Sequence, residues 1–467
     1  MNTRGKTAVS GGDRELREQL RRVVELSIPA ILAEISSMAM QYIDAAMVGS
    51  LGANASASIG LVSTSTWLMG GLCISVATGF SVQTAHLIGA GRLEEARSVL
   101  RQALGTALAV GLLLCLAGVS ISGWLPVWLG GEETIRRDAS SYFFIYACAL
   151  PAVQMRQLAG SMLQCSGNMK TPSVLNAIMC GLDVVFNWLL IFPDHHMSFL
   201  GITIPGADMG VAGAALGTAL AEWVTAVLML AAVCLKSPKL RLTAGGGSWK
   251  LTPQCALAAA KIAVPMAFEH TVLCGAQIAS TKIVAPLGTV SIAANSLAVT
   301  AESLCYLPGY GIAAAATTLV GQSLGAKRKD LARRYARLSV FLAVILMAAM
   351  AVVMFMGAPA VFALLTPDPA VRELGVLVLR IEAFAEPLYA VSIAAAGALR
   401  GAGDTLVPSL LNLASMWGVR ITAASLLAPR LGLTGVWLAM CGELCVRGVL
   451  FLIRLLREKW LEHAMEI

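Results

Sequence analysis

The sequence predicts an all-α polytopic membrane protein with twelve transmembrane helices in two six-helix lobes, related by a pseudo-twofold axis along the membrane normal. Its composition, a series of long apolar stretches and an internal repeat predict this fold. Of the 467 residues, 57% are hydrophobic and only 13% are charged. Because soluble domains carry about 25% charged residues, the composition excludes a soluble enzyme, a disordered chain and a disulfide-rich secreted domain.

Twelve stretches are apolar and long enough to cross a bilayer, which takes about 20 residues. They run near 25–48, 59–86, 99–123, 140–163, 172–193, 210–235, 256–285, 292–320, 338–364, 374–398, 408–428 and 434–456. The polar segment before the first stretch lacks the apolar core of a signal peptide, so we expect it to remain on the protein. The 11 cysteines lie mostly within the apolar stretches, where we expect free thiols.

The basic residues between the stretches predict the orientation, since Lys and Arg concentrate in cytoplasmic loops. With a cytoplasmic N-terminus, that side receives 25 of the 34 Lys and Arg residues, the opposite side receives four, and five lie within spans. We therefore expect a multi-pass protein of the inner (plasma) membrane with both termini in the cytoplasm. Because this topology accounts for the net charge of +7, we expect no nucleic-acid partner.

The second half of the chain repeats the first at an offset of 236 residues, without a gap over four spans. Matching pairs include Pro29/Pro265, Gln41/Gln277, Gly52/Gly288, Arg92/Arg328, Pro151/Pro387 and Asn176/Asn412. Each repeat has an even number of spans, so the two enter the membrane from the same side and are parallel. Rocking of one lobe against the other would give alternating access.

The repeat also predicts the domain boundaries. We expect a cytoplasmic tail over 1–24, an N-lobe over 25–235, a cytoplasmic linker over 236–255, a C-lobe over 256–456 and a second cytoplasmic tail over 457–467.

Motifs of energy-converting and metal-dependent enzymes are missing from the sequence. It has no GxxxxGK[ST] phosphate loop, no HExxH pair and no soluble stretch large enough for a nucleotide-binding domain. We therefore expect neither an enzyme nor a resident metal or cofactor, and uphill transport would draw on an ion gradient.

Ionisable residues inside spans are costly to bury and are functional by default. In the N-lobe, Asp44 follows Gln41 by about one turn, and Asn176, Asp183 and Asn187 share one stripe of the fifth span. A carboxylate with amide neighbours in a low-dielectric lobe is suited to exchange a proton or to accept Na⁺. These five residues are the predicted cation-coupling site; the alternative is that the two acids are hydrogen-bonded structural groups.

The C-lobe carries its own acids within predicted spans. The candidates for coupling or substrate binding there are Glu269, Glu302, Glu382 and Glu386. Intramembrane cations such as Arg420 and Arg447 are available to neutralise some of the acids in this lobe, so simple ion pairing is the alternative.

Several segments resemble the multidrug and toxic compound extrusion (MATE) family of secondary transporters. IPAILAEISSMAMQYIDAAMVGSLG resembles the first helix of that family, and VPMAFEHTVLCGAQIASTKIVAPLG resembles the seventh. TTLVGQSLGAKRKDLAR resembles the end of the eighth helix, and LRGAGDTLVPSLLN resembles the junction of helices 10 and 11. The likeness extends from about Leu26 to Leu456.

The resemblance implies a twelve-helix antiporter in the lipid bilayer that exports small organic, often cationic, compounds in exchange for H⁺ or Na⁺. Many members carry coupling acids on helices 1 and 5, which match Asp44 and Asp183. Members that rely on helices 7 and 10 point to Glu269, Glu382 or Glu386 instead. In some of these members, the acid of helix 7 lies nearly a turn after the position of Glu269. This chain has Leu273 at that later position, so Glu269 does not match their acid directly.

Three alternatives stay open at this point. The first is a lipid-linked oligosaccharide flippase of the same superfamily, which would show a strongly cationic cavity. The second is an exporter of one specific metabolite, and the third is a non-transporting membrane enzyme or sensor. We expect the protein to be a monomer.

Overall fold

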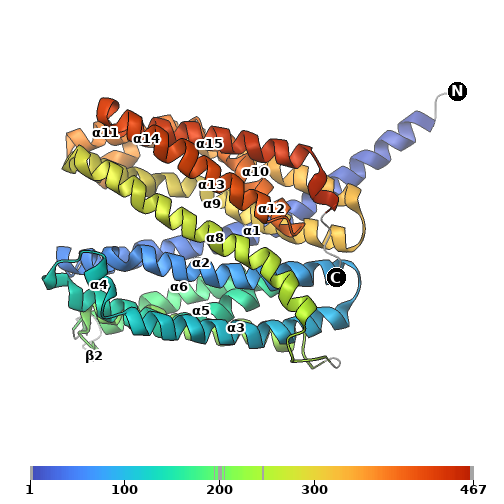
Figure 1. Ribbon diagram of the computed structural model, residues 1–467, viewed down its shortest axis with the longest axis horizontal. Coiled ribbons are helices and arrows are strands. Elements are labelled where there is room, and N and C mark those ends of the chain that lie inside the picture. The colour runs from blue at the N-terminus through green and yellow to red at the C-terminus, as the bar shows by residue number, and fades with distance from the viewer. Residues whose placement is uncertain (1–3, 194, 198–201, 205, 244–246, 463–467) are drawn as a thin grey trace. The chain divides into compact units, whose positions relative to one another are not determined.

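The computed structural model describes residues 4–193, 195–197, 202–204, 206–243 and 247–462, most of which are helical (Figure 1). The first half contains α1 (Arg4–Gly49), α2 (Ala53–Gly89), α3 (Leu93–Ile121), α4 (Leu125–Trp128), α5 (Glu133–Cys165), α6 (Lys170–Ile191) and α7 (Gly210–Ala231), which continues into the π-helix η1 (Ala232–Lys236). Strands β1 (His195–Met197) and β2 (Ile202–Ile204) pair antiparallel between α6 and α7.

The second half follows the same order of helices. It contains α8 (Pro253–Val284), the 3₁₀ turn η2 (Ala285–Leu287), α9 (Thr289–Gly325), α10 (Lys329–Leu365), α11 (Pro369–Ala383), α12 (Glu386–Gly401), α13 (Leu406–Leu413), the π-helix η3 (Ala414–Ile421), α14 (Thr422–Leu431), α15 (Leu433–Leu456) and the 3₁₀ turn η4 (Lys459–Glu462).

Ten helical segments among the described residues are long and apolar enough to cross a membrane by themselves. The two other predicted spans differ from them for separate reasons. The predicted span 140–163 lies within the continuous α5, whose middle is made more polar by Gln154, Arg156 and Gln157. The predicted span 374–398 is interrupted at Phe384 and Ala385, which separate α11 from α12. Neither α11 nor α12 is long enough to cross a bilayer alone.

The internal repeat is visible in the helix ends. Helices α2 and α9 both have 37 residues, and their first and last residues differ by the offset of 236. The turns before them use Gly52 and Gly288 with φ values of 115° and 100°, a region that residues with a Cβ rarely adopt. The same local sequence therefore produces the same turn in both halves.

The chain forms two compact units, which we describe separately. One contains residues 32–88 and 92–270, and the other contains 1–31, 89–91 and 271–466. Helix α1 passes from one unit to the other after Ile31, and α8 does so after His270. These two crossing points are nearly equivalent in the internal repeat, because the offset of 236 relates Ile31 to Ala267. The predicted lobe boundaries at 25–235 and 256–456 stay a prediction.

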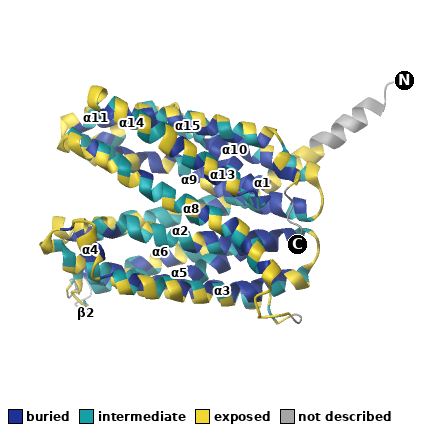
Figure 2. Cartoon of the chain, in the orientation of Figure 1, coloured by how far each residue is buried: buried dark blue, intermediate teal, exposed yellow. Residues whose placement is uncertain are grey.

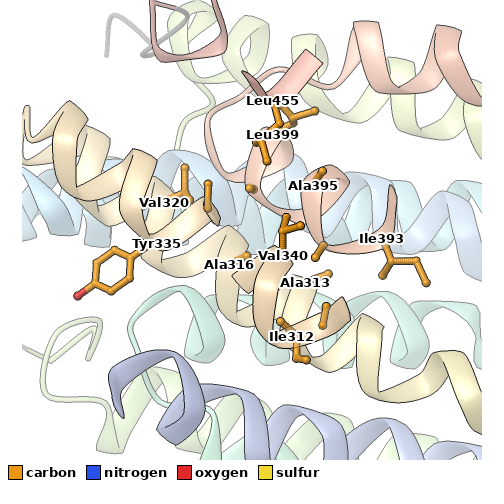
Figure 3. Packing of buried hydrophobic residues seen from close by; sticks show 14 of the residues in the cluster. Ile312, Ala313, Ala316, Val320, Tyr335, Val340, Ile393, Ala395, Leu399 and Leu455 are labelled. Atoms are coloured by element: carbon orange, nitrogen blue, oxygen red, sulfur yellow. The ribbon is translucent and has the colours of Figure 1, made fainter. Parts of the chain in front are cut away.

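Small residues allow close helix packing in the unit that contains α9. Figure 3 shows Ala313 and Ala316 of α9, Val340 of α10 and Ala395 of α12 within one apolar cluster. A Cβ added to Gly397 of α12 would lie 2.5 Å from the carbonyl oxygen of Ala313. Close approach of this kind is typical of helices that pack within a membrane.

Exposed residues occur along the helices (Figure 2), and many of them have large apolar side chains. Leu113 and Leu116 of α3 are each 66% exposed, and Met356 of α10 is 74% exposed. Such a surface is stable in contact with lipid chains rather than with water. The helices, their length and this surface make the chain a multi-pass membrane protein.

Candidate functional site

A polar cluster inside the 32–270 unit joins α1 to α6. Asn187 Nδ2 donates hydrogen bonds to Asp44 Oδ1 at 2.8 Å and to Asp183 Oδ2 at 3.1 Å. Asp183 and Asn187 lie on one face of α6 because they are four residues apart, and both are fully buried. One amide group therefore bridges two carboxyl groups at a depth where ionisable groups are expensive to bury.

Two oxygens of this cluster lack a partner. Asp183 Oδ1 and Asn187 Oδ1 are buried and accept no hydrogen bond from the residues that the structure describes. Since buried polar atoms are nearly always paired, these oxygens are available to a proton donor or a small cation. Gly217 of α7 makes room for the cluster, because a Cβ at that position would overlap Asn187 Oδ1.

Two further residues that sequence reasoning missed face the same cluster. Tyr142 of α5 interacts electrostatically with both Asp44 and Asp183. The side chain of Thr218, on α7, interacts with Asp183. Tyrosine and threonine carry no charge at neutral pH and are common in membrane helices. The sequence therefore contained no signal that would have selected these two residues.

The other two predicted members of this site take no part in the hydrogen bonds of the bridge among the described residues. Gln41 is exposed on α1. Asn176 lies seven residues before Asp183 on α6, about 10 Å along the axis. Its Oδ1 atom is buried without a hydrogen-bond partner. Helical spacing predicts which residues share a face of α6, but it does not limit how far along the helix a site extends.

A buried ion pair lies near this cluster in the same unit. Arg156 of α5 donates to both carboxylate oxygens of Glu222 on α7, at 2.5 and 3.1 Å. Arg156 also interacts electrostatically with Glu34 of α1, and Glu222 does so with Asp183. Arg156 is therefore already paired with Glu222. Among the described residues, no cationic side chain is hydrogen-bonded to Asp44 or Asp183.

A second acidic cluster lies in the other unit. Oxygens of Glu302 on α9, Glu382 on α11 and Glu386 on α12 all lie within 4.8 Å of one another. The structure thus brings together three of the four predicted C-lobe acids. Glu269 belongs to the 32–270 unit and is not part of this cluster.

The ion pair predicted as an alternative for this lobe is present as well. Arg447 of α15 donates to both oxygens of Glu443, at 2.7 and 2.8 Å. Pairing therefore accounts for Glu443, which is fully buried. It does not account for Glu382 and Glu386, whose four carboxylate oxygens have no hydrogen-bond partner.

Comparison with known proteins agrees with this architecture. The MatE family model matches residues 29–189 and again residues 265–426, which together make up more than half of the chain. The chain belongs to the MatE family. The two matches begin 236 residues apart, at the offset of the internal repeat. Membership makes the protein a transporter and not an enzyme.

The curated relatives of this MatE protein match along nearly the whole chain. A probable multidrug resistance protein NorM from Thermotoga maritima is 26% identical, covering 97% of this chain and 95% of its own length. A protein of the same description from Idiomarina loihiensis is 24% identical and covers 94% of both chains.

Solved structures show the same fold. The Vibrio cholerae MATE transporter VcmN in its bent form has a TM-score of 0.84 at 19% identity, covering 95% of this chain and 97% of VcmN. A MOP superfamily transporter from Pyrococcus furiosus, described by the reverse polarity of its binding pocket, has a TM-score of 0.86 at 18% identity and the same coverage. The predicted two-lobe helical membrane fold is thereby confirmed.

Proposed function

We propose that this MatE protein is a secondary active antiporter that exports organic, often cationic and amphipathic, compounds in exchange for H⁺ or Na⁺ by alternating access. The observation that carries the proposal is the bridge of Asp44, Asn187 and Asp183, with its two unpartnered oxygens and no cation among the described residues that is hydrogen-bonded to it. The multidrug description of the NorM relatives supports the substrate class.

The chemistry of the bridge suits ion exchange. Two adjacent carboxylates repel each other when both are ionised, so a proton or Na⁺ stabilises the pair. Asn187 donates to both acids and thereby keeps them together when the cation leaves. A cationic substrate and the coupling ion would then compete for the same negative charge.

The runner-up functions fit less well. A flippase for pyrophosphate-linked lipids needs a cationic cavity, whereas Arg156 is paired with Glu222 and the bridge is acidic. Export of one specific metabolite uses the same machinery and differs only in the substrate. A coupling route through Glu302, Glu382 and Glu386, with or without Glu269, stays an alternative prediction.

Transport into reconstituted vesicles tests the proposal. We expect a cationic dye to be pumped by wild type under an imposed pH or Na⁺ gradient, and we expect Asp44→Asn and Asp183→Asn to reduce the gradient-driven rate at least about tenfold. Asp138→Asn, an exposed acid on α5, is the matched control. Full activity of Asp44→Asn would refute coupling through this bridge.

A further inference from the structure

The unpartnered glutamates of the 271–466 unit are arranged as ligands rather than as a proton-sharing pair. Glu382 and Glu386 are fully buried, and Glu302 is 7% exposed. Carboxyl groups that share a proton lie about 2.5–2.7 Å apart and are hydrogen-bonded. No oxygen of Glu382 or Glu386 makes a hydrogen bond, although oxygens of all three residues lie within 4.8 Å of one another.

This spacing fits a shared metal ion. Oxygens bound to one Mg²⁺, Mn²⁺ or Ca²⁺ at about 2.0–2.6 Å are roughly 3–5 Å from each other. Three carboxylates supply up to six oxygens, the number that an octahedral hard cation takes. Monodentate binding would leave places for water.

One arginine lies close enough to act on this cluster electrostatically. Arg420 of the π-helix η3 interacts electrostatically with Glu302 and Glu382. Glu443 is neutralised by Arg447. Metal ligands bind as ionised carboxylates, and three ionised glutamates with one arginine would sum to a charge of −2, which a divalent cation would balance.

The internal repeat indicates that the fold itself does not require these acids. At the offset of 236, the counterparts of Glu302, Glu382 and Glu386 are Thr66, Tyr146 and Leu150. Tyr146 donates to the Thr66 carbonyl oxygen at 3.0 Å, and α5 runs unbroken through this position. The repeat copy with acids is the one whose helix is interrupted, directly between Glu382 and Glu386.

We propose that Glu302, Glu382 and Glu386 bind one divalent hard cation, such as Mn²⁺ or Mg²⁺, at the break between α11 and α12. The ion links the two helix segments by taking ligands from each of them and from α9. The spacing of these residues in the sequence gave no metal motif, because α9 and α11 are separated by α10. The site is independent of the Asp44–Asn187–Asp183 bridge and of the coupling ion used there.

Mn²⁺ binding to the full-length protein in lipid nanodiscs tests the proposal, with electron paramagnetic resonance to count free Mn²⁺. We expect one buried Mn²⁺ per chain in wild type, and at least about tenfold weaker binding in Glu382→Gln and Glu386→Gln. Glu373→Gln, an exposed acid nine residues before Glu382 on α11, should bind as wild type does. Mn²⁺ should also raise the thermal unfolding temperature of wild type but not that of the two variants.

Several outcomes would overturn the site. They are no stoichiometric Mn²⁺ binding by folded wild type, unchanged binding by both variants, or displacement of Mn²⁺ by equimolar Na⁺. Asp44→Asn separates this inference from the proposed function: it should bind Mn²⁺ normally although its efflux is lost. Loss of Mn²⁺ binding in Asp44→Asn would place the ion elsewhere and also refute the proposal.

Discussion

At the scale of single residues, the Asn187 amide is the centre of the proposed coupling bridge, and its position depends on a glycine. Gly217 of α7 has no Cβ where one would overlap Asn187 Oδ1. We predict that Gly217→Ala displaces the amide, lowers the free energy of unfolding by about 1–3 kcal/mol and reduces gradient-driven efflux. Gly181→Ala on α6 is the control, because nothing lies within 4 Å of its added Cβ. Equal efflux by both variants would contradict the role given to Asn187.

The buried pair of Arg156 and Glu222 allows a second prediction at this scale. Their side chains are only 12% and 10% exposed. Glu222→Gln leaves a buried guanidinium without its counter-ion, so we expect a loss of about 3–5 kcal/mol in the free energy of unfolding. A double variant with Arg156→Gln should lose less than the sum of the single variants. Additive losses in denaturation measurements would show that the two side chains are not coupled.

At the scale of elements, most helices were predictable and the exceptions have identifiable causes. Apolar length identified α3 and α10, and the repeat paired Gly52 with Gly288, which the structure places in matching turns. The break between α11 and α12 was not predicted. Proline does not explain it, because Pro151 lies inside the unbroken α5 at the position equivalent to Pro387. The sequence alone also does not show that Glu302 of α9 lies close to the two acids that flank the break.

A third prediction concerns that break. Replacing Glu382 and Glu386 by their repeat counterparts, as Glu382→Tyr with Glu386→Leu, removes two buried acids that repel each other. In the presence of a chelator, we expect the double variant to unfold at a temperature a few degrees higher than wild type. A gain of about 1 kcal/mol in the free energy of unfolding raises the unfolding temperature by about 2–4 °C in a chain of 150–250 residues, and by less in a longer chain. Thermal denaturation measures this. A folded double variant that is less stable than wild type would show that the acids stabilise the break without a cation.

At the scale of the whole molecule, the two repeats share a fold but not the acids of their polar clusters. The counterparts of Asp44, Asp183 and Asn187 at the offset of 236 are Ser280, Val419 and Ala423. Sequence reasoning found which side chains are candidates, because ionisable residues within apolar spans are costly to bury. It could not group them, since Glu269 and Glu302 are in successive predicted spans yet belong to different compact units.

The fourth prediction concerns how this asymmetric molecule lies in the membrane. The loop asymmetry of 25 to four basic residues predicts cytoplasmic termini. Lys170 at the start of α6 and Lys250 before α8 are exposed, so a membrane-impermeant amine reagent can reach both once it is on their side. In intact cells we expect neither lysine to be modified, and in inverted vesicles we expect both, as measured by peptide mass spectrometry. Modification of both lysines in intact cells would show that the topology is the opposite of the predicted one. The Asp44 bridge would then receive its coupling ion from the other side of the membrane. Modification of only one would mean an odd number of crossings between them, which the parallel repeat does not allow.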